Sequence, residues 1–158
     1  MDIELRAAGP GDLDLVLGLM RGLYASEHIA FEEQRARQAL AELLADPGLG
    51  TVWLVEAGRE VPEVIGYAIL TLGYSLEFGG RFALLDELFI HESHRGRGAG
   101  GQALRRIEEA GRVLGLHAIR LEVSRTNGRA QELYRRAGFV AHDRDLMTWW
   151  LDEKERQR

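Results

Sequence analysis

The 158-residue chain contains no cysteine. This absence excludes disulfide bonds, zinc sites built on thiolates and catalysis through a cysteine nucleophile. It also lacks any apolar run near the roughly 18 residues that span a bilayer. The N-terminal residues lack the basic and apolar regions of a signal peptide. We therefore expect a cytoplasmic protein with no membrane partner, and a reducing compartment also suits a chain without cysteine.

The chain likewise lacks an excess of basic residues, because its net charge is −5. General nucleic-acid binders carry a positive balance, so we expect no nucleic-acid partner. Apolar residues make up 46% of the sequence, which is enough for a buried core. The length fits one ordinary domain, and no repeat or long linker interrupts it. We expect a single domain over residues 1–158.

Hydrophobic spacing predicts a mixed α/β fold. Apolar residues alternate at the N-terminus as in a strand, and two stretches at helical spacing follow. Strands are expected at 3–7, 51–56, 64–72, 82–90, 119–123, 139–141 and 146–151, and helices at about 13–24, 31–44, 99–114 and 127–137. The order β-α-α-β-β-β-α-β-α-β-β predicts a mixed sheet rather than a regular βαβ alternation.

The segment Arg95–Gly101 (RGRGAGG) lies between an expected strand and an expected amphipathic helix. Successive glycines let backbone N–H groups converge on one anion, and a helix N-terminus adds unsatisfied donors with partial positive charge. Arg95 and Arg97 can add charge-assisted hydrogen bonds. The segment predicts a phosphate site, and a plain glycine-rich turn is the alternative.

The same glycines also match the dinucleotide-binding pattern GxGxxG, with Glu122 about 20 residues further on. Two features disfavour this alternative. Five residues, His91–Arg95, separate the strand end from Gly96, and only 36 residues follow Glu122. That length is too short for the remaining parallel strands of such a fold.

Three segments together resemble the GNAT superfamily of acetyl-CoA-dependent N-acetyltransferases. DELFI at 86–90 resembles the central strand of the family, and RxxGxG at 95–100 its pyrophosphate motif. NxxAxxLYxxxGF at 127–139 resembles the C-terminal helix motif. The resemblance is strongest over residues 82–142. It implies the GNAT fold, acetyl-CoA as co-substrate and no metal.

The resemblance also implies roles for individual residues. The backbone at Leu88, Phe89 and Ile90 would meet the pantetheine arm of acetyl-CoA. Asn127 would contact pantetheine or the acceptor, or would only cap its helix. Tyr134 would protonate the leaving thiolate, with a core position as the alternative. The pyrophosphate would be held by backbone N–H groups of Arg95, Gly96, Arg97, Gly98, Ala99, Gly100 and Gly101.

Acetyl transfer to a primary amine requires a proton acceptor, because an alkyl amine has a pKa near 10.4. Asp86 and Glu87 are adjacent on the expected strand, so only one of them can face the site. We expect Glu87 to accept the proton, directly or through water; a solvated or salt-bridged carboxylate is the alternative. Without a cysteine, we expect direct transfer in a ternary complex.

The acceptor is expected to be a small-molecule amine or a peptide amine. Acidic and aromatic residues suit such a cation, although an ordinary acidic surface would have the same composition. A non-catalytic acyl-CoA-binding module of the same fold is a second hypothesis. Trp149 and Trp150 near the C-terminus are expected in the core or in a homodimer contact. The candidate acceptor-binding residues are Tyr24, Glu27, Tyr74, Glu77 and Asp86.

Overall fold

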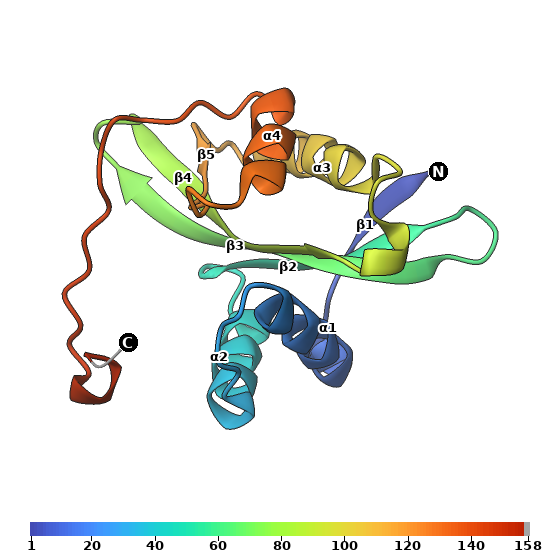
Figure 1. Cartoon of the computed structure of the whole chain (residues 1–158), viewed down its shortest axis with the longest axis horizontal. Helices are drawn as coiled ribbons and strands as arrows, with labels where there is room; N and C mark the ends of the chain where they lie inside the picture. Colours follow the sequence, from blue (N-terminus) through green and yellow to red (C-terminus); the bar gives the residue numbers. More distant parts are fainter. Residues whose placement is uncertain (157–158) are drawn as a thin grey trace.

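The computed structural model describes residues 1–156; residues 157 and 158 of the expected domain lie outside the described residues. A five-stranded sheet separates helices α1 and α2 on one face from α3 and α4 on the other (Figure 1). In chain order, the elements are β1 (Ile3–Ala7), α1 (Leu13–Ser26), α2 (Glu33–Ala45), β2 (Gly50–Ala57), β3 (Glu63–Ser75), β4 (Gly80–Ile90), α3 (Ala99–Val113), β5 (Ile119–Arg120) and α4 (Gly128–Ala137).

The sheet is mixed, as the sequence predicts. Strands β1 to β4 pair antiparallel in chain order, and β5 joins β4 in parallel through the pairs Ala83↔Ile119 and Leu84↔Arg120. The dinucleotide-binding alternative is wrong, because that fold requires a run of parallel strands connected by helices. The expected α/β class is confirmed.

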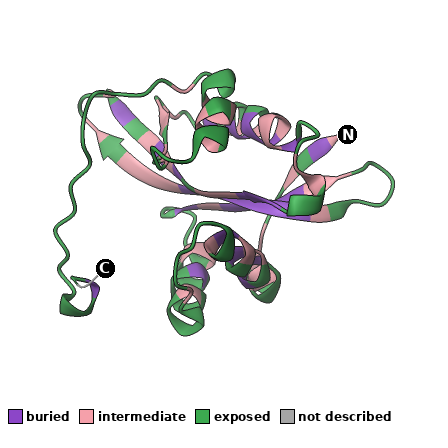
Figure 2. Ribbon diagram, viewed as in Figure 1, coloured by how far each residue is buried: buried purple, intermediate pink, exposed green. Residues whose placement is uncertain are grey.

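The core forms two layers, one on each face of the sheet. On one side, Leu17 and Met20 of α1 pack with Leu54 and Tyr67 of the sheet. On the other, α3 contributes Ile107 and its neighbours. Figure 2 shows burial concentrated in the central strands and on the inward helix surfaces. Leu114, the last residue of the expected helix at 99–114, is 44% exposed because it follows the last turn of α3.

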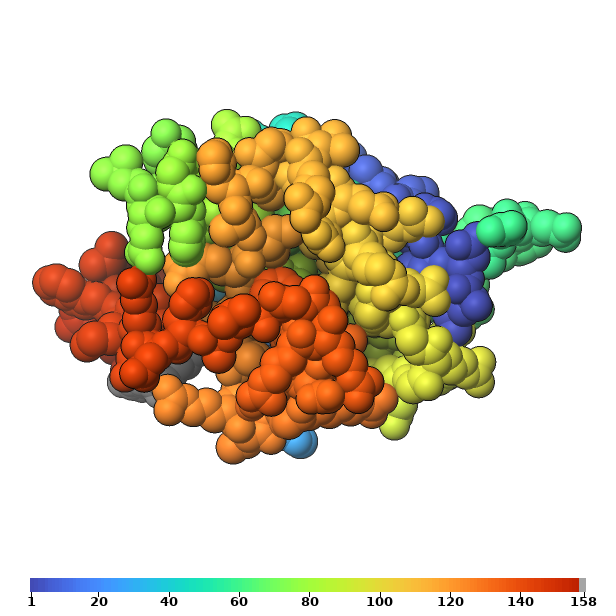
Figure 3. Space-filling view, turned by 90° about the horizontal axis from the view of Figure 1, so that it is seen from above, coloured from blue at the N-terminus to red at the C-terminus, as the bar shows by residue number. Residues whose placement is uncertain are grey.

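The two closing strands expected at 139–141 and 146–151 are not formed. Residues 139–150 have no strand pairing, and the chain runs away from the sheet as an extended segment (Figures 1 and 3). The strand expected at 119–123 is only two residues long. An extended segment becomes a strand only where a neighbouring backbone satisfies its N–H and C=O groups. Among residues 1–156, no strand pairs with this segment.

None of the described helices is both long enough and apolar enough to cross a membrane.

Candidate active site

A β-bulge in β4 determines the direction in which Glu87 points. Ile69 of β3 lies opposite Glu87 and Leu70 lies opposite Leu85, so Asp86 has no partner across the pair. An extra residue of this kind reverses the alternation of side chains beyond it. Leu85 accordingly packs in the α3 layer, whereas the Glu87 carboxylate bonds to Tyr24 of α1. The bulge therefore turns Glu87 to the α1 face.

Two phenols hold the Glu87 carboxylate. The Tyr24 hydroxyl donates to Oε2 at 2.8 Å, and the Tyr67 hydroxyl donates to Oε1 at 2.9 Å. Burial raises the pKa of Glu87 above its ordinary value of 4.5, and the two phenol bonds oppose part of that shift. Burial also raises the pKa of Tyr67, so its hydroxyl stays protonated. A carboxylate with a raised pKa is a stronger base.

Two further acids lie around Glu87. Glu27 directly follows α1, and its charge raises the pKa of both Glu87 and Tyr134. Its carboxylate is therefore within electrostatic range of both groups. Asp86 is exposed to solvent, yet neighbouring protein atoms partly desolvate its carboxylate and raise its pKa. The structure thus brings Tyr24, Glu27 and Asp86 close to Glu87, and the surroundings are acidic.

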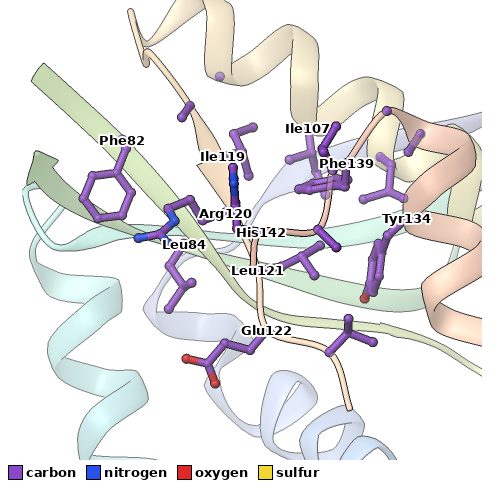
Figure 4. Close-up of a pocket in the computed structure, with 18 of the residues that line it drawn as sticks. Phe82, Leu84, Ile107, Ile119, Arg120, Leu121, Glu122, Tyr134, Phe139 and His142 are labelled. Atoms are coloured by element: carbon purple, nitrogen blue, oxygen red, sulfur yellow. The ribbon is translucent and has the colours of Figure 1, made fainter. Parts of the chain in front are cut away.

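Tyr134 projects from α4 and packs edge-to-face on Phe139, with 5.7 Å between ring centroids. Burial is the main cause of its raised pKa, and the charge of Glu27 adds to it. The phenol therefore keeps its proton at neutral pH. Figure 4 shows Tyr134 toward one end of a groove, with Phe82 toward the other.

The edge of β4 next to β5 is open beyond Leu84. Pairing with β5 ends at Leu84↔Arg120, so no strand of the described chain lies beside residues 85–90 on that edge. Unpaired backbone groups of an edge strand can bond an extended ligand arm. The expected segment Leu88–Ile90 lies on this stretch. One of its carbonyls, that of Ile90, already accepts a hydrogen bond from Arg95 Nε at 2.7 Å.

The glycine turn fits a pyrophosphate group. Gly96 and Gly98 have φ angles of +76° and +80°, a backbone conformation that glycine adopts without strain. Gly98 caps α3, and the first N–H groups of that helix, from Ala99 to Gly101, have no intrahelical acceptor. Apart from the adjoining residues of the chain, no described atom lies within 4 Å of where a Cβ would stand at Gly96 or Gly98. Several N–H donors therefore border open space at a helix N-terminus.

Other residues of the turn have structural roles. The guanidinium of Arg95 lies over the Phe89 ring at 5.3 Å from its centroid while Nε bonds Ile90. Arg95 thus braces the turn against β4 and is partly buried, whereas Arg97 is exposed. A Cβ at Gly100 would stand 3.2 Å from Leu133, so this glycine permits the close approach of α3 and α4.

Asn127 acts as a helix cap. Its Oδ1 accepts a hydrogen bond from the backbone N–H of Ala130 at 3.1 Å, at the start of α4. This bond satisfies one of the orphan donors of the helix.

Two candidate acceptor residues lie far from Glu87. Tyr74 is 75% exposed and pairs with Arg81, six residues along β4 from Glu87. At the rise of a strand this is about 20 Å. Glu77, on the same hairpin, accepts a hydrogen bond from Arg144 at 2.9 Å. The structure does not bring Tyr74 and Glu77 together with Glu87.

Tyr67 was not among the residues expected at the site. A signal for it exists, because it is the one hydroxyl-bearing aromatic residue in the apolar stretch 64–72. A buried phenol requires a polar partner. No group of three or more potential metal ligands occurs within residues 1–156.

The sequence of this chain is similar to those of known proteins. The family model described as "Acetyltransferase (GNAT) family" matches residues 19–139. A thialysine N-epsilon-acetyltransferase of Bos taurus is 26% identical over 151 residues, covering 86% of this chain and 83% of the relative. A streptothricin acetyltransferase of Streptomyces lavendulae is 27% identical over 153 residues, covering 87% and 81%.

Solved structures share the whole architecture. An integron cassette protein from the mobile metagenome of Cole Harbour Salt Marsh superposes with a TM-score of 0.81 at 33% identity, covering 94% of this chain and 90% of that one. A protein of Clostridium acetobutylicum, described as a predicted acetyltransferase and solved with acetyl-CoA, gives a TM-score of 0.76 at 19% identity, covering 93% and 96%. Both superpositions include the sheet and the helices on each of its faces, because they cover more than nine tenths of this chain.

Proposed function

Because this chain belongs to the GNAT family of acetyltransferases, we propose that it moves the acetyl group of acetyl-CoA onto the primary amine of a small cationic molecule. The observation that carries this proposal is the Glu87 carboxylate, held by Tyr24 and Tyr67 and surrounded by further acids. This arrangement combines a proton acceptor with a negative field that attracts an ammonium group.

The names of the relatives favour a small acceptor. One relative acts on thialysine at its N-epsilon position, and another acts on streptothricin. The acidic residues Glu27, Asp86 and Glu87 of this chain suit such a cation. A peptide amine remains the competing acceptor, and the experiment below separates the two.

The glycine turn and the open edge of β4 fit acetyl-CoA. Open N–H donors at Ala99–Gly101 would hold the pyrophosphate, and the backbone of Leu88 and Phe89 would meet the pantetheine arm. When bound, acetyl-CoA supplies an acetyl group activated as a thioester. The protein of Clostridium acetobutylicum with this architecture was solved with the same molecule.

The roles of Glu87 and Tyr134 follow from their proton affinities. Releasing the proton of an ammonium with a pKa near 10.4 costs roughly 4–5 kcal/mol at pH 7. Glu87 accepts that proton, directly or through water, and its raised pKa makes it a better acceptor. Tyr134 retains its phenolic proton and donates it to the sulfur as the C–S bond breaks and the C–N bond forms. Attack leaves a second proton on the acylated nitrogen; this proton returns through water to the Tyr134 phenolate, and Glu87 releases its proton to solvent.

A screen of amines with acetyl-CoA tests the proposal. Release of free thiol would be followed for diamines, amino acids and short peptides, with the wild type and Glu87→Gln. We expect turnover on small cationic amines and a loss of about 10²-fold or more in the variant. Tyr74→Phe, a variant at the distant hairpin, should keep wild-type rates. Binding of CoA without turnover of any amine, turnover of peptides alone, or a competent covalent acetyl-enzyme would contradict the proposal.

A further inference from the structure

The aromatic ring of Phe89 in β4 contacts several elements that the chemistry requires. Phe89 lies two residues beyond Glu87 and is 6% exposed. Its ring packs in the layer between the sheet and α1. The side chain has no titratable group, so it takes no part in the proton transfers described above. Any influence of the ring on the reaction therefore comes through the residues that it touches.

Helix α1 approaches the ring closely at Gly22. A Cβ added at Gly22 would stand 2.8 Å from Cζ of Phe89 and 3.1 Å from Cε1. Carbon atoms in contact are normally about 3.5–4.0 Å apart, so a side chain does not fit there unless its surroundings move. A Cβ at Gly18, one turn earlier in α1, would meet no described atom within 4 Å apart from the adjoining residues and the backbone of the helix itself. The missing side chain at Gly22 thus lets α1 rest on the tip of the Phe89 ring.

The glycine turn rests on the same ring through Arg95. The guanidinium carbon of Arg95 lies over the ring at 5.3 Å from its centroid, which is the range of a cation–π contact. Arg95 Nε also donates to the carbonyl of Ile90 at 2.7 Å. Arg95 is the first residue of the turn, so these two contacts hold the backbone where it enters the turn. A shift of the Phe89 ring therefore disturbs the support of the N–H donors that would hold the pyrophosphate.

The two phenols that hold Glu87 depend on this ring as well. Tyr67 lies opposite Phe89 in the pairing of β3 with β4, and the two ring centroids are 6.2 Å apart. Tyr24 follows Gly22 by two residues on α1. The contact of that helix with the ring therefore sets how far the Tyr24 hydroxyl reaches toward Glu87. The ring thus supports both the surroundings of the base and the start of the glycine turn.

We propose that the Phe89 side chain is a positioning residue that couples the glycine turn to helix α1. Through Arg95 it holds the turn, and through its contact with Gly22 it holds the helix that carries Tyr24. A close-packed interior transmits strain, so one displacement of the ring alters both CoA binding and the hydrogen bonds of Glu87. The inference rests on the proposed function for the roles of the turn and of Glu87.

The substitution Gly22→Ala tests this coupling from the α1 side. It adds one methyl group and changes no residue of the glycine turn. Because the methyl group and the ring tip cannot both keep their places, the ring shifts against Arg95 and α1 shifts outward with Tyr24. We expect the Kd for CoA to rise about three- to tenfold, the effect of losing a cation–π contact. The acid limb of kcat/KM should move to higher pH, because Glu87 loses a well-placed donor.

Gly18→Ala is the matched control. It makes the same replacement in the same helix at an open position, so both variants gain helix propensity alike. Gly18→Ala should keep the wild-type affinity for CoA and the wild-type pH profile. Circular dichroism and urea unfolding would verify that both variants are folded. Calorimetric titration with CoA and rate profiles across pH are the readouts, because a loss of stability alone moves neither of them.

Phe89→Leu provides a rescue experiment. Leucine lacks the Cζ atom that the new methyl group of Gly22→Ala would strike, and it also removes the ring below Arg95. Phe89→Leu should therefore weaken CoA binding by itself. Addition of Gly22→Ala to this variant should cost no further affinity, so the effects of the two substitutions on the Kd for CoA are non-additive.

Two results would overturn the inference while leaving the proposed function in place. One is a Gly22→Ala protein that binds CoA as tightly as Gly18→Ala does, which would show that α1 and the turn are independent. The other is an equal loss of affinity from Gly22→Ala in the wild-type and Phe89→Leu backgrounds, which would show that the ring does not connect them. A wild type that binds no CoA would instead contradict the proposed function, and the inference with it.

Discussion

Tyr67 donates a hydrogen bond to Glu87 diagonally across two neighbouring strands. In the pairing of β3 with β4, Tyr67 lies opposite Phe89, and the bond to Glu87 Oε1 is 2.9 Å long. The phenol has no solvent exposure at all. Glu87 can receive this bond only because the bulge at Asp86 turns its side chain to the same face. The position and the proton affinity of the proposed base are therefore coupled to a residue buried behind it.

The Tyr67→Phe substitution tests this coupling. Loss of a donor to the charged carboxylate raises the pKa of Glu87 further, so the acid limb of kcat/KM should move to higher pH. Unfolding free energy should fall by about 1–2 kcal/mol, because Glu87 loses a buried partner. Rate profiles across pH and urea unfolding would measure the two effects. Tyr74→Phe serves as the exposed control. If the acid limb stays at its wild-type position in Tyr67→Phe, Tyr67 does not influence the pKa of Glu87.

Glu87 also makes stability depend on pH. Its pKa in the folded protein lies above the ordinary 4.5, so the folded state binds more protons between those two values. Its contribution is fully present below the ordinary pKa and is lost as pH rises through the folded value. The wild type should therefore lose stability relative to Glu87→Gln as pH rises through this window. Urea unfolding of both proteins from pH 4 to 8 would measure the difference, and the opposite slope would contradict the raised pKa.

Tyr134→Phe should separate catalysis from binding. Removing the phenolic proton is expected to lower kcat by about 10²-fold while KM for the amine changes little. Steady-state kinetics with a saturating thioester would measure both constants. An unchanged kcat would mean that water protonates the sulfur and that Tyr134 has a packing role with Phe139.

The glycine turn offers a matched pair of substitutions. Gly98 and Gly115 stand at opposite ends of α3 with φ angles of +80° and +72°, and a Cβ at either position would meet no described atom within 4 Å beyond the adjoining residues. Alanine at either position should cost about 1–2 kcal/mol of stability through the same backbone strain. Only Gly98→Ala should weaken CoA binding, because only that end of the helix presents free N–H groups. Calorimetric titration with CoA would decide this, and equal affinity in both variants would remove the turn as the pyrophosphate site.

Charge at Glu27 provides a last test. Glu27→Gln removes a negative charge that acts on both Glu87 and Tyr134. We expect KM for a cationic amine to rise about three- to tenfold at low salt and the difference to shrink at high salt, since exposed charges are screened. Arg59→Gln, at the distant β2–β3 turn, is the control. If KM changes neither with the substitution nor with the salt concentration, an electrostatic role of Glu27 is excluded.

Much of the fold could be predicted from the sequence, because most elements have strong local signals. Helix α4 ends at Ala137 as expected, where Gly138 follows with a φ of +105°, and Asn127 caps its start. Strand β1 has the expected bounds. The sequence favours Glu87 over Asp86 as the base, but it carries no sign of the bulge, which depends on the register between β3 and β4. Pairing register is a property of two strands and is not contained in either one.

The segments at 139–141 and 146–151, which are expected as strands, show a second limit of prediction from sequence. The apolar residues at 146–151 have strand character, but a strand also requires a partner, and no strand within residues 1–156 pairs with this segment. Tyr74 and Glu77 do not join Glu87, because the β3–β4 hairpin that carries them extends beyond the helices packed around Glu87. In both cases, the local sequence indicates the conformation of a segment but not which other segments lie beside it in the fold.

The bulge in β4 makes the unpaired state of one residue a determinant of chemistry. Leu85 and Glu87 face opposite sides of the sheet, as adjacent residues of a regular strand do, because Asp86 between them is left unpaired. If Asp86 were drawn into regular pairing, Leu85 and Glu87 would share a face, and the carboxylate would be buried under α3 or the strand beyond it would pair out of register. Straightening the strand with all its residues retained would thus dismantle the site without removing any of its functional groups.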